Sequence, residues 1–182
     1  GDVQVFAQVL AEGDEVALYP GLNCGCCEQC FAGEHSQCVR FGIVGVQRHG
    51  TFAEQVAVPA SNVWPKPSNL DFTQSAALAV AYLTAWRMLF NRGELTPGDT
   101  VLIHGIGGGV ALAGLQLAKM GGAEVIATSS SDRKLKRAQK LGADHTLNYR
   151  TTEDVADVVR DMTGGRGVDL AFDSVGAATW PI

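Results

Sequence analysis

The sequence predicts an α/β fold, in which a doubly wound parallel sheet follows a smaller, β-rich segment. Three observations predict it. Four cysteines crowd into one loop near the amino terminus, a glycine-rich turn joins an apolar strand to an apolar helix, and strand and helix patterns then alternate. With 182 residues, of which 46% are hydrophobic and 18% charged, the chain has the size and composition of one or two globular domains.

Composition and cysteine usage exclude several classes of protein. The net charge of −5 argues against a nucleic-acid partner, for which a basic face is expected. There is no apolar run long enough to span a bilayer and no secretory pattern at the amino terminus. All 5 cysteines fall between positions 24 and 38, and such crowding favours a metal site over a disulfide framework. We therefore expect a cytoplasmic protein that binds no membrane.

Short strands and loops are expected over residues 1–63. The apolar run at 16–18 predicts one strand, and an alternation of polar and apolar residues predicts another over 51–58. Pro65 and Pro67 then mark a domain boundary, so the second domain is expected to cover residues 64–182.

The cysteine loop has the spacing of a metal site. Cys24, Cys27, Cys30 and Cys38 are separated by two, two and seven residues. Four thiolates this close together can surround one tetrahedral ion at Zn–S distances of about 2.3 Å, and such a closed site stabilises a loop without touching substrate. Cys26 breaks the spacing and is left out as a bystander thiol.

Two further interpretations of this loop stay open. C-x2-C-x2-C also begins the bacterial ferredoxin run of an iron–sulfur cluster, but there a gap of about three residues precedes the fourth cysteine and a proline follows it. Here Val39 follows Cys38. The cysteines could also be ordinary buried side chains, although the loop has little apolar material to bury them. The four histidines are interpreted as ordinary rather than functional side chains: His35, His49, His104 and His145.

A long helix and an alternating pattern make up the rest of the chain. Asp71 and Gln74 predict a capping box for a helix through Phe90, which is apolar nearly all round and is expected to be buried. The elements then expected are strand 100–104, helix 110–120, strand 124–128, helix 132–141, strand 145–149, helix 152–162 and strand 168–172. This alternation predicts a parallel sheet with helices on both faces.

A glycine-rich turn joins the first strand of this run to its helix. Glycines there let the backbone approach a pyrophosphate, whose charge faces the amino terminus of the helix. The strict G-x-G-x-x-G spacing fails at Val110, whereas Gly105-x-x-Gly108-x-x-Ala111 fits, and the strand–turn–helix–strand unit takes about thirty residues. The candidate cofactor-binding residues of the turn are Gly105, Gly107, Gly108, Gly109 and Val110.

The end of the second strand selects the dinucleotide. An acidic residue there binds the ribose 2′-hydroxyl of NAD. This chain has hydroxyl groups instead, at Ser129 and Ser130, followed by Asp132, Arg133 and Lys134. Hydroxyls and cations suit a 2′-phosphate, so NADP is favoured, while Asp132 as an NAD-type acid keeps NAD open. Alternatively, Ser131 only caps the next helix, and Arg133 and Lys134 only solvate it.

Together these residues make the chain similar to the zinc-containing alcohol dehydrogenases of the medium-chain dehydrogenase/reductase superfamily, from about Gly13 onward. The motifs that carry the resemblance are Gly13-Asp14-Glu15-Val16, the four-cysteine lobe, Gly50-Thr51-Phe52-Ala53-Glu54, Thr84-Ala85-Trp86, Gly108-Gly109-Val110, Gln116-Leu117-Ala118-Lys119, Leu141-Gly142-Ala143-Asp144 and Gly165-Arg166-Gly167-Val168-Asp169. The resemblance implies an incomplete Rossmann-type cofactor domain, preceded by part of a GroES-like catalytic domain that carries the zinc lobe.

The resemblance also implies roles for particular residues. The four cysteines match structural-zinc ligands, Thr84 matches a position near the nicotinamide, and residues 173–176 match the segment beside its ribose. Lys134 and Tyr149 match positions that face the adenosine phosphate in NADPH-dependent members similar to quinone reductases. Val80 stands where many members have a cysteine ligand of a catalytic zinc, and the other ligands of that ion lie upstream of this sequence. No catalytic residue is therefore assigned.

By the same resemblance, the chain is expected to be an internal fragment of a longer enzyme, with four of the usual six sheet strands. The whole protein is expected to form a homodimer or tetramer. The isolated fragment, with an unpaired sheet edge, is expected to be poorly soluble.

The expected function is hydride transfer between NAD(P)H and an alcohol, aldehyde or related carbonyl compound. Val80 favours a different reaction, NADPH-dependent quinone or enone reduction without a catalytic zinc. Against it, many quinone reductases of the superfamily lack the four-cysteine lobe. The same fold could also belong to a catalytically silent NADPH-binding protein, and the cysteine spacing leaves an iron–sulfur electron carrier open.

Overall fold

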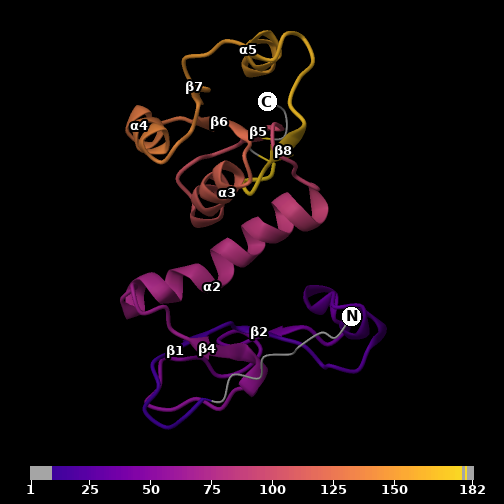
Figure 1. Ribbon diagram of the computed structural model, residues 1–182, viewed down its shortest axis with the longest axis vertical. Coiled ribbons are helices and arrows are strands. Elements are labelled where there is room, and N and C mark those ends of the chain that lie inside the picture. The colour runs from indigo at the N-terminus through magenta and orange to yellow at the C-terminus, as the bar shows by residue number, and fades with distance from the viewer. Residues whose placement is uncertain (1–9, 178, 180–182) are drawn as a thin grey trace. The chain divides into compact units, whose positions relative to one another are not determined.

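The computed structural model describes residues 10–177 and residue 179. The chain divides into two compact units, Gly1–Val80 and Ala81–Ile182, whose colours in Figure 1 run from indigo to magenta and from there to yellow. This division falls inside a helix, later in the chain than the two prolines. The domain boundary expected at residue 63 remains a prediction.

Two short antiparallel strand pairs form the first unit. Strand β1 (Val16–Leu18) pairs with β4 (Val63–Pro65), and β2 (Gly21–Leu22) pairs with β3 (Gly42–Ile43). The connecting segments contain three helical turns: α1 (Glu28–Phe31), η1 (His35–Gln37) and η2 (Ala60–Asn62). Buried Asn62 joins the two pairs, because its side-chain amide donates to the carbonyls of Tyr19 and Gly21 at 2.8 and 2.6 Å. The strand expected at 16–18 is confirmed.

The strand expected over 51–58 is wrong. This segment is bend and coil, and every side chain from 51 to 57 is exposed. An alternating sequence becomes a strand only where a neighbouring strand completes its hydrogen bonds. No strand within the described part of the chain pairs with this segment. The alternation therefore overstates the regular structure here.

Helix α2 (Phe72–Trp86) begins as predicted and ends differently. Asp71 Oδ1 accepts a hydrogen bond from the Gln74 N–H at 2.7 Å, and Gln74 Oε1 accepts one from the Asp71 N–H at 3.1 Å. These two bonds complete the predicted capping box. From Arg87 to Arg92 the chain forms a π-helical turn (η3), in place of the regular helix expected through Phe90.

The expectation that this helix is buried is wrong for much of its length. Val80, Leu83 and Trp86 are 53%, 48% and 50% exposed. Ala85 and Leu89, in contrast, belong to the buried core of the second unit. A helix buries only the side that packs against a core. Apolar residues on its other sides therefore stay exposed, even when they are many.

The second unit is a four-stranded parallel sheet in the order β7–β6–β5–β8, with helices around it (Figure 1). Its elements in chain order are β5 (Thr100–Ile103), α3 (Gly109–Met120), β6 (Glu124–Ser129), α4 (Asp132–Lys140), β7 (His145–Asn148), α5 (Val155–Met162) and β8 (Leu170–Phe172). The predicted alternation of strands and helices, and the parallel sheet, are confirmed.

Successive residues of β5 face opposite sides of this sheet. Val101 and Ile103 join the larger core, which includes apolar residues of α3 and α4. Leu102 joins a smaller core with Val155 and Val159 of α5. Helices thus cover both faces, which is the doubly wound arrangement that the sequence predicts.

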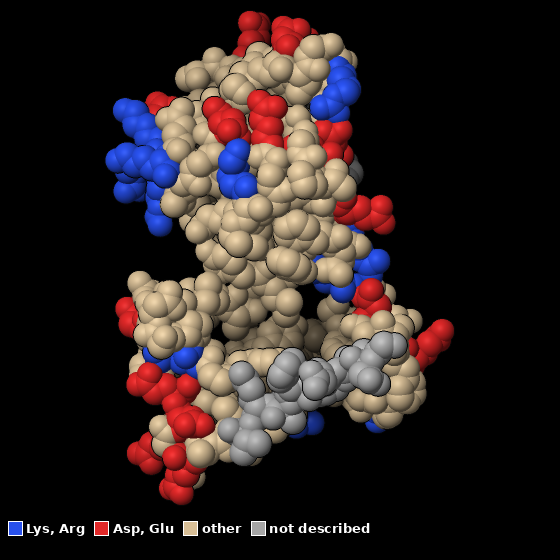
Figure 2. All heavy atoms as spheres, viewed as in Figure 1, with Lys and Arg blue, Asp and Glu red and all other residues tan. Residues whose placement is uncertain are grey.

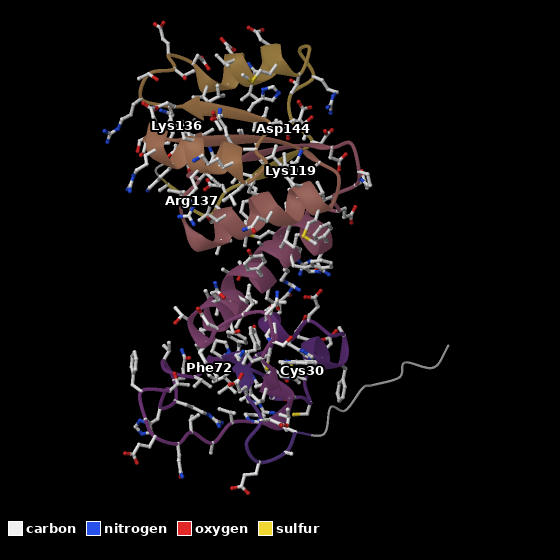
Figure 3. The ribbon with its side chains drawn as sticks, turned by 60° about the vertical axis from the view of Figure 1, so that its left-hand side comes forward. Cys30, Phe72, Lys119, Lys136, Arg137 and Asp144 are labelled. Atoms are coloured by element: carbon white, nitrogen blue, oxygen red, sulfur yellow. The ribbon has the colours of Figure 1, made fainter. Side chains whose placement is uncertain are left out.

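Charged side chains lie on the outside of the second unit. Lys119 Nζ of α3 lies 2.7 Å from the Oδ2 atom of Asp144, which precedes β7 (Figure 3). Lysine and arginine side chains gather over α4, at the left of Figure 2. No helix within the described residues is long and apolar enough to cross a bilayer.

Candidate functional site

The first candidate site is the cysteine loop of the first unit. Cys27 precedes α1 and Cys30 lies in it (Figure 3), while Cys24 and Cys38 flank this short helix in the chain. The four sulfur atoms all lie within 4.8 Å of one another, with Cys30 Sγ at 3.9 Å from Cys24 Sγ and 3.5 Å from Cys27 Sγ. Sulfurs bound at about 2.3 Å to one tetrahedral ion lie about 3.8 Å apart. The sulfurs therefore have the spacing of such a site.

N–H groups donate to the sulfurs of this loop. The backbone N–H groups of Cys24 and Arg40 both donate to Cys38 Sγ at 3.3 Å. The Arg40 guanidinium donates to Cys26 Sγ at 2.8 Å. Cationic and backbone donors stabilise negative charge on sulfur. Arg40 was missed by the sequence analysis, because a single arginine after the last cysteine carries no recognisable signal. Cys26 is exposed and is not a member of the group of four.

The thiols of the cluster do not ionise alike. A hydrogen bond from the Cys26 backbone lowers the pKa of Cys24 to about 5. Burial raises the pKa of Cys30 to about 11. An ion that binds all four sulfurs must displace the proton of Cys30, and an all-sulfur donor set is one that zinc uses in closed four-coordinate sites. The residues present therefore fit a zinc ion.

The second candidate site is the glycine turn of the second unit. Gly105 (φ +67°) and Gly107 (φ +138°) have backbone conformations that L-residues rarely adopt. The turn is attached to the end of β6, because the Ile106 N–H donates to the Thr128 carbonyl at 2.8 Å and the Gly105 N–H to Thr128 Oγ1 at 3.4 Å. A Cβ on Gly108, the N-cap of α3, would meet nothing within 4 Å. Open space beside a helix amino terminus suits a pyrophosphate.

A buried polar pair adjoins this turn. His104 Nδ1 lies 3.3 Å from Thr128 Oγ1, and the two residues are 6% and 0% exposed. Burial lowers the pKa of His104, and the negative charge of Asp173 opposes this effect. From the sequence alone, His104 is predicted to be an ordinary strand-end residue. Its partner lies on the neighbouring strand, 24 residues away, and no local pattern reveals it.

Lys134 of α4 reaches the same turn. A Cβ on Gly107 would lie 2.7 Å from Lys134 Cδ and 3.3 Å from its Nζ. The lysine side chain therefore lies across Gly107, and its ammonium group adds a positive charge beside the amino terminus of α3. The structure brings these two predicted cofactor residues together, although they belong to different elements.

Two of the predicted hydroxyl groups lie at the carboxyl end of β6, Ser129 in the strand and Ser130 directly after it. Ser129 is buried, and its Oγ accepts a hydrogen bond from the Ser131 N–H at 3.3 Å. Ser130 is half-buried. The Tyr149 N–H donates to the Ser129 carbonyl at 3.2 Å, so Tyr149 follows the neighbouring strand at the same edge of the sheet. Its side chain packs partly against the smaller core.

The remaining predicted residues lie on α2 and α3. Thr84 is exposed on α2. Ala81, three residues before it, lies beside the start of α3, because its Cβ would be 3.7 Å from a Cβ on Gly109. Val110 packs against the larger core, so its side chain supports the helix rather than facing a ligand.

Asp132 follows β6 at the start of α4. Its Oδ1 accepts a hydrogen bond from Asn148 Nδ2 at 2.6 Å. Asp132 is the residue that could act as the acid of an NAD site. One of its carboxylate oxygens is thus already hydrogen-bonded to Asn148 of β7.

The loop after β8 contacts the glycine turn, where a Cβ on Gly105 would collide with Val175 Cγ2. Asp173 shapes this loop. Its Oδ1 accepts from the N–H groups of Val175 and Gly176 at 2.7 and 3.1 Å, and its Oδ2 accepts from the Thr179 hydroxyl at 2.7 Å. Burial raises the pKa of Asp173, but these hydrogen bonds outweigh it and hold the pKa below its usual range.

Two family models match the chain. The alcohol dehydrogenase GroES-like domain matches residues 2–68, and the zinc-binding dehydrogenase domain matches residues 109–181. A 2-haloacrylate reductase of Burkholderia sp is 40% identical over 132 residues, which cover 71% of this chain and 39% of that protein. A zinc-type alcohol dehydrogenase-like protein of Schizosaccharomyces pombe is 41% identical over 140 residues, which cover 76% of this chain and 40% of that protein.

A solved structure of an NAD-dependent alcohol dehydrogenase is similar over most of this chain. It matches with a TM-score of 0.89 at 49% identity, and the match covers 93% of this chain and 49% of that one. The chain thus spans about half or less of each of these proteins.

Proposed function

Because the chain belongs to the medium-chain dehydrogenase/reductase superfamily, among its zinc-containing alcohol dehydrogenases, we propose that the whole protein transfers a hydride between NAD(P)H and an alcohol, aldehyde or related carbonyl compound. The observation that carries this proposal is the glycine turn between β5 and α3. It combines glycines in left-handed conformations, open space at the N-cap of α3 and Lys134 across Gly107. A helix amino terminus with such a turn binds the phosphates of a dinucleotide.

For the first unit we propose one structural zinc ion, held by Cys24, Cys27, Cys30 and Cys38. The sulfur spacing and the donors from Cys24 and Arg40 support it. A shell of four sulfurs leaves no open position, so such an ion stabilises the loop and takes no part in the reaction.

Of the two dinucleotides we favour NADP. Serine hydroxyls in place of an acid end β6, Lys134 adds a cation near the turn, and Asn148 engages one oxygen of Asp132. These features suit a 2′-phosphate better than a ribose 2′-hydroxyl. NAD is the competing cofactor, since one similar structure is of an NAD-dependent enzyme.

When bound, the nicotinamide supplies or accepts the hydride. Residues of this chain would hold the phosphates of that cofactor. The N–H groups at the start of α3 and the Lys134 ammonium would bind them, and Thr128 holds the glycine turn in place through its hydrogen bonds to Gly105 and Ile106. Val175 limits the space beside Gly105.

Val80 favours a second candidate function, which is enone or quinone reduction without a catalytic zinc. A side chain of valine cannot bind metal, and here the position is exposed on α2. In this reaction the substrate carbon takes the hydride and a protein group or water supplies the proton. One relative is named for reducing 2-haloacrylate, which agrees with this candidate.

Metal analysis and turnover of the whole protein separate the candidates. Oxidation of NADPH and NADH is measured with benzaldehyde, cyclohexenone and benzoquinone, and zinc is counted per chain. Two zinc ions with aldehyde turnover support metal-assisted chemistry. One zinc ion with enone or quinone turnover supports the second candidate. NADPH binding without turnover of any of these compounds would indicate a catalytically silent protein, and failure to bind either dinucleotide would contradict the proposal.

We also propose that the whole protein is cytoplasmic and, by the resemblance to its superfamily, a homodimer or tetramer. Multi-angle light scattering of the purified whole protein measures the oligomeric state directly. A monomer at micromolar concentration would contradict it.

A further inference from the structure

His104 is a buried titratable residue to which the proposed function gives no role. It directly follows β5 and precedes the glycine turn. Its backbone N–H donates to the Phe172 carbonyl of β8 at 3.0 Å, and its Nδ1 atom lies 3.3 Å from Thr128 Oγ1 of β6. His104 therefore contacts both neighbours of β5 in the sheet, at the point where the glycine turn begins.

Thr128 holds the glycine turn through two hydrogen bonds of different kinds. Its backbone carbonyl accepts from the Ile106 N–H at 2.8 Å, a bond that any residue at this position would provide. Its Oγ1 atom accepts from the Gly105 N–H at 3.4 Å, a bond that requires a hydroxyl group. Because a glycine backbone is free to adopt many conformations, each bond to Gly105 restricts the turn. The Thr128 hydroxyl is thus the support of the turn that depends on a side chain.

The proton of this hydroxyl needs an acceptor. A threonine hydroxyl has one proton to donate and two lone pairs with which to accept. One lone pair accepts from the Gly105 N–H, and within the described residues the proton has its acceptor in His104 Nδ1. The Nδ1 atom must then carry no proton. If it did, it would donate to Oγ1 and leave the hydroxyl proton unpaired in a buried place, at a cost in free energy.

The charge state of His104 agrees with this direction of the hydrogen bond. Burial lowers the pKa of His104, and the negative charge of Asp173 on the loop after β8 opposes burial without outweighing it. The imidazole is therefore neutral at pH 7, with one nitrogen atom that donates and one that accepts. Nδ1 is the accepting nitrogen, and the proton lies on Nε2.

We infer that His104 is a positioning residue for the dinucleotide: its Nδ1 atom orients the Thr128 hydroxyl, which in turn holds the Gly105 N–H and the glycine turn. A turn that is fixed before binding loses less freedom when it takes up phosphates, so the affinity for the dinucleotide is higher. This inference rests on the proposed function, because it assigns a role within the same cofactor site. The rival explanation is that His104 only fills space beside β5.

Two substitutions of His104 separate the roles of its nitrogen atoms. The amide of an asparagine reaches the position of Nδ1, whereas the amide of a glutamine reaches that of Nε2. Hydrogen exchange of the Gly105 N–H, followed by NMR in the whole protein without dinucleotide, measures how firmly the turn is held. We expect exchange to be roughly 3- to 10-fold faster in His104→Gln, as the loss of one neutral hydrogen bond produces, and nearly unchanged in His104→Asn.

Calorimetric titration with NADPH and with NADH measures the consequence for binding. We expect His104→Gln to raise both dissociation constants roughly 3- to 10-fold and His104→Asn to leave them near those of the wild type. Thr128→Val should act like His104→Gln, and Thr128→Ser should retain the affinity. Combining His104→Gln with Thr128→Val should cost no more than either change alone, because both break the same chain of hydrogen bonds.

His145→Gln is the matched control. His145 begins β7, whereas the glycine turn lies at the carboxyl ends of the strands, and its Nε2 atom lies 3.0 Å from Glu124 Oε1. This substitution should change neither the exchange of the Gly105 N–H nor the affinity for either dinucleotide.

The outcomes separate this inference from the proposed function. A folded His104→Gln protein with unchanged exchange and unchanged dissociation constants would overturn the inference, even if urea unfolds it more easily, because His104 would then only fill space. Costs that add in the double variant would overturn it too. If His104→Gln does not fold, the Thr128 variants decide, and equal affinity of Thr128→Val and the wild type contradicts the inference. A wild type that binds neither dinucleotide would overturn the proposed function and the inference together.

Discussion

Replacing Gly105 by alanine tests the geometry of the glycine turn. Gly105 has a φ of +67°, and a Cβ there would collide with Val175 Cγ2. Gly108 offers a matched comparison three residues later, because its φ is −78° and its Cβ would meet nothing within 4 Å. The same substitution is therefore expected to disturb the protein at one glycine and to be accommodated at the other.

The cost at Gly105 has two parts. A left-handed conformation costs an alanine about 1–2 kcal/mol relative to glycine. Crowding against a neighbouring side chain adds about 1–3 kcal/mol in a tightly packed core, and because Val175 is 48% exposed the lower end applies. Gly105→Ala should therefore lower the free energy of unfolding of the second unit by about 2–3 kcal/mol.

Urea unfolding followed by circular dichroism measures this difference. Val175→Ala in the Gly105→Ala background should recover about 1 kcal/mol, which is the crowding part, and leave the backbone strain. Gly108→Ala should cost at most about 1 kcal/mol, because alanine is a poorer N-cap residue than glycine, yet it should bind NADPH more weakly, since its methyl group enters the open space beside α3. A Gly105→Ala protein as stable as the wild type would refute the reasoning. A double variant no more stable than Gly105→Ala alone would refute it as well.

Four further substitutions test other parts of the structure. Cys30→Ser in the whole protein should lower the zinc content by one ion per chain in metal analysis, whereas Cys26→Ser should not. Asp71→Ala should cost about 1 kcal/mol in urea unfolding because it removes the cap of α2, and Asp71→Ser should retain most of that stability. Lys134→Ala should weaken NADPH binding roughly tenfold in fluorescence titrations, and Lys136→Ala on the exposed side of α4 should not (Figure 3). Burial raises the pKa of Asp144, but hydrogen bonds from Lys119 and the Val125 N–H outweigh burial and hold the pKa below its usual range. The Asp144 carboxylate therefore stabilises the fold above about pH 4. This contribution to stability is lost as the pH falls through the pKa of Asp144 in the folded protein. Asp144→Asn should accordingly be less stable than the wild type at neutral pH and equal to it in strong acid.

Local patterns were sufficient to predict the second unit. Its strands and helices are bounded by glycines, prolines and capping residues. Within each short element the apolar residues recur with a clear strand or helix spacing. Even so, α5 begins at Val155 and not at Thr152, because the Asp154 side chain caps the helix by accepting from the Asp157 N–H at 3.0 Å. An aspartate ahead of an apolar run is a capping signal that the sequence analysis could have used.

The cysteine cluster was also within reach of the sequence, because its four members lie in one loop and their spacing limits where the sulfurs can go. Contacts between distant segments were not. The approach of Lys134 to Gly107 and the pairing of His104 with Thr128 depend on how α4 and the strands pack. The exposure of Val80 likewise depends on what covers α2, which an apolar sequence does not specify.

The two candidate sites are encoded in separate stretches of chain. The hydrogen bonds of the sulfur cluster join residues 23–40, and the contacts of the glycine turn described above join residues 81–175. Each stretch could therefore be transplanted by itself. A chimaera that receives residues 100–149 from a relative with the other dinucleotide preference should acquire that preference. Its requirement for a metal ion during folding should remain that of the recipient protein.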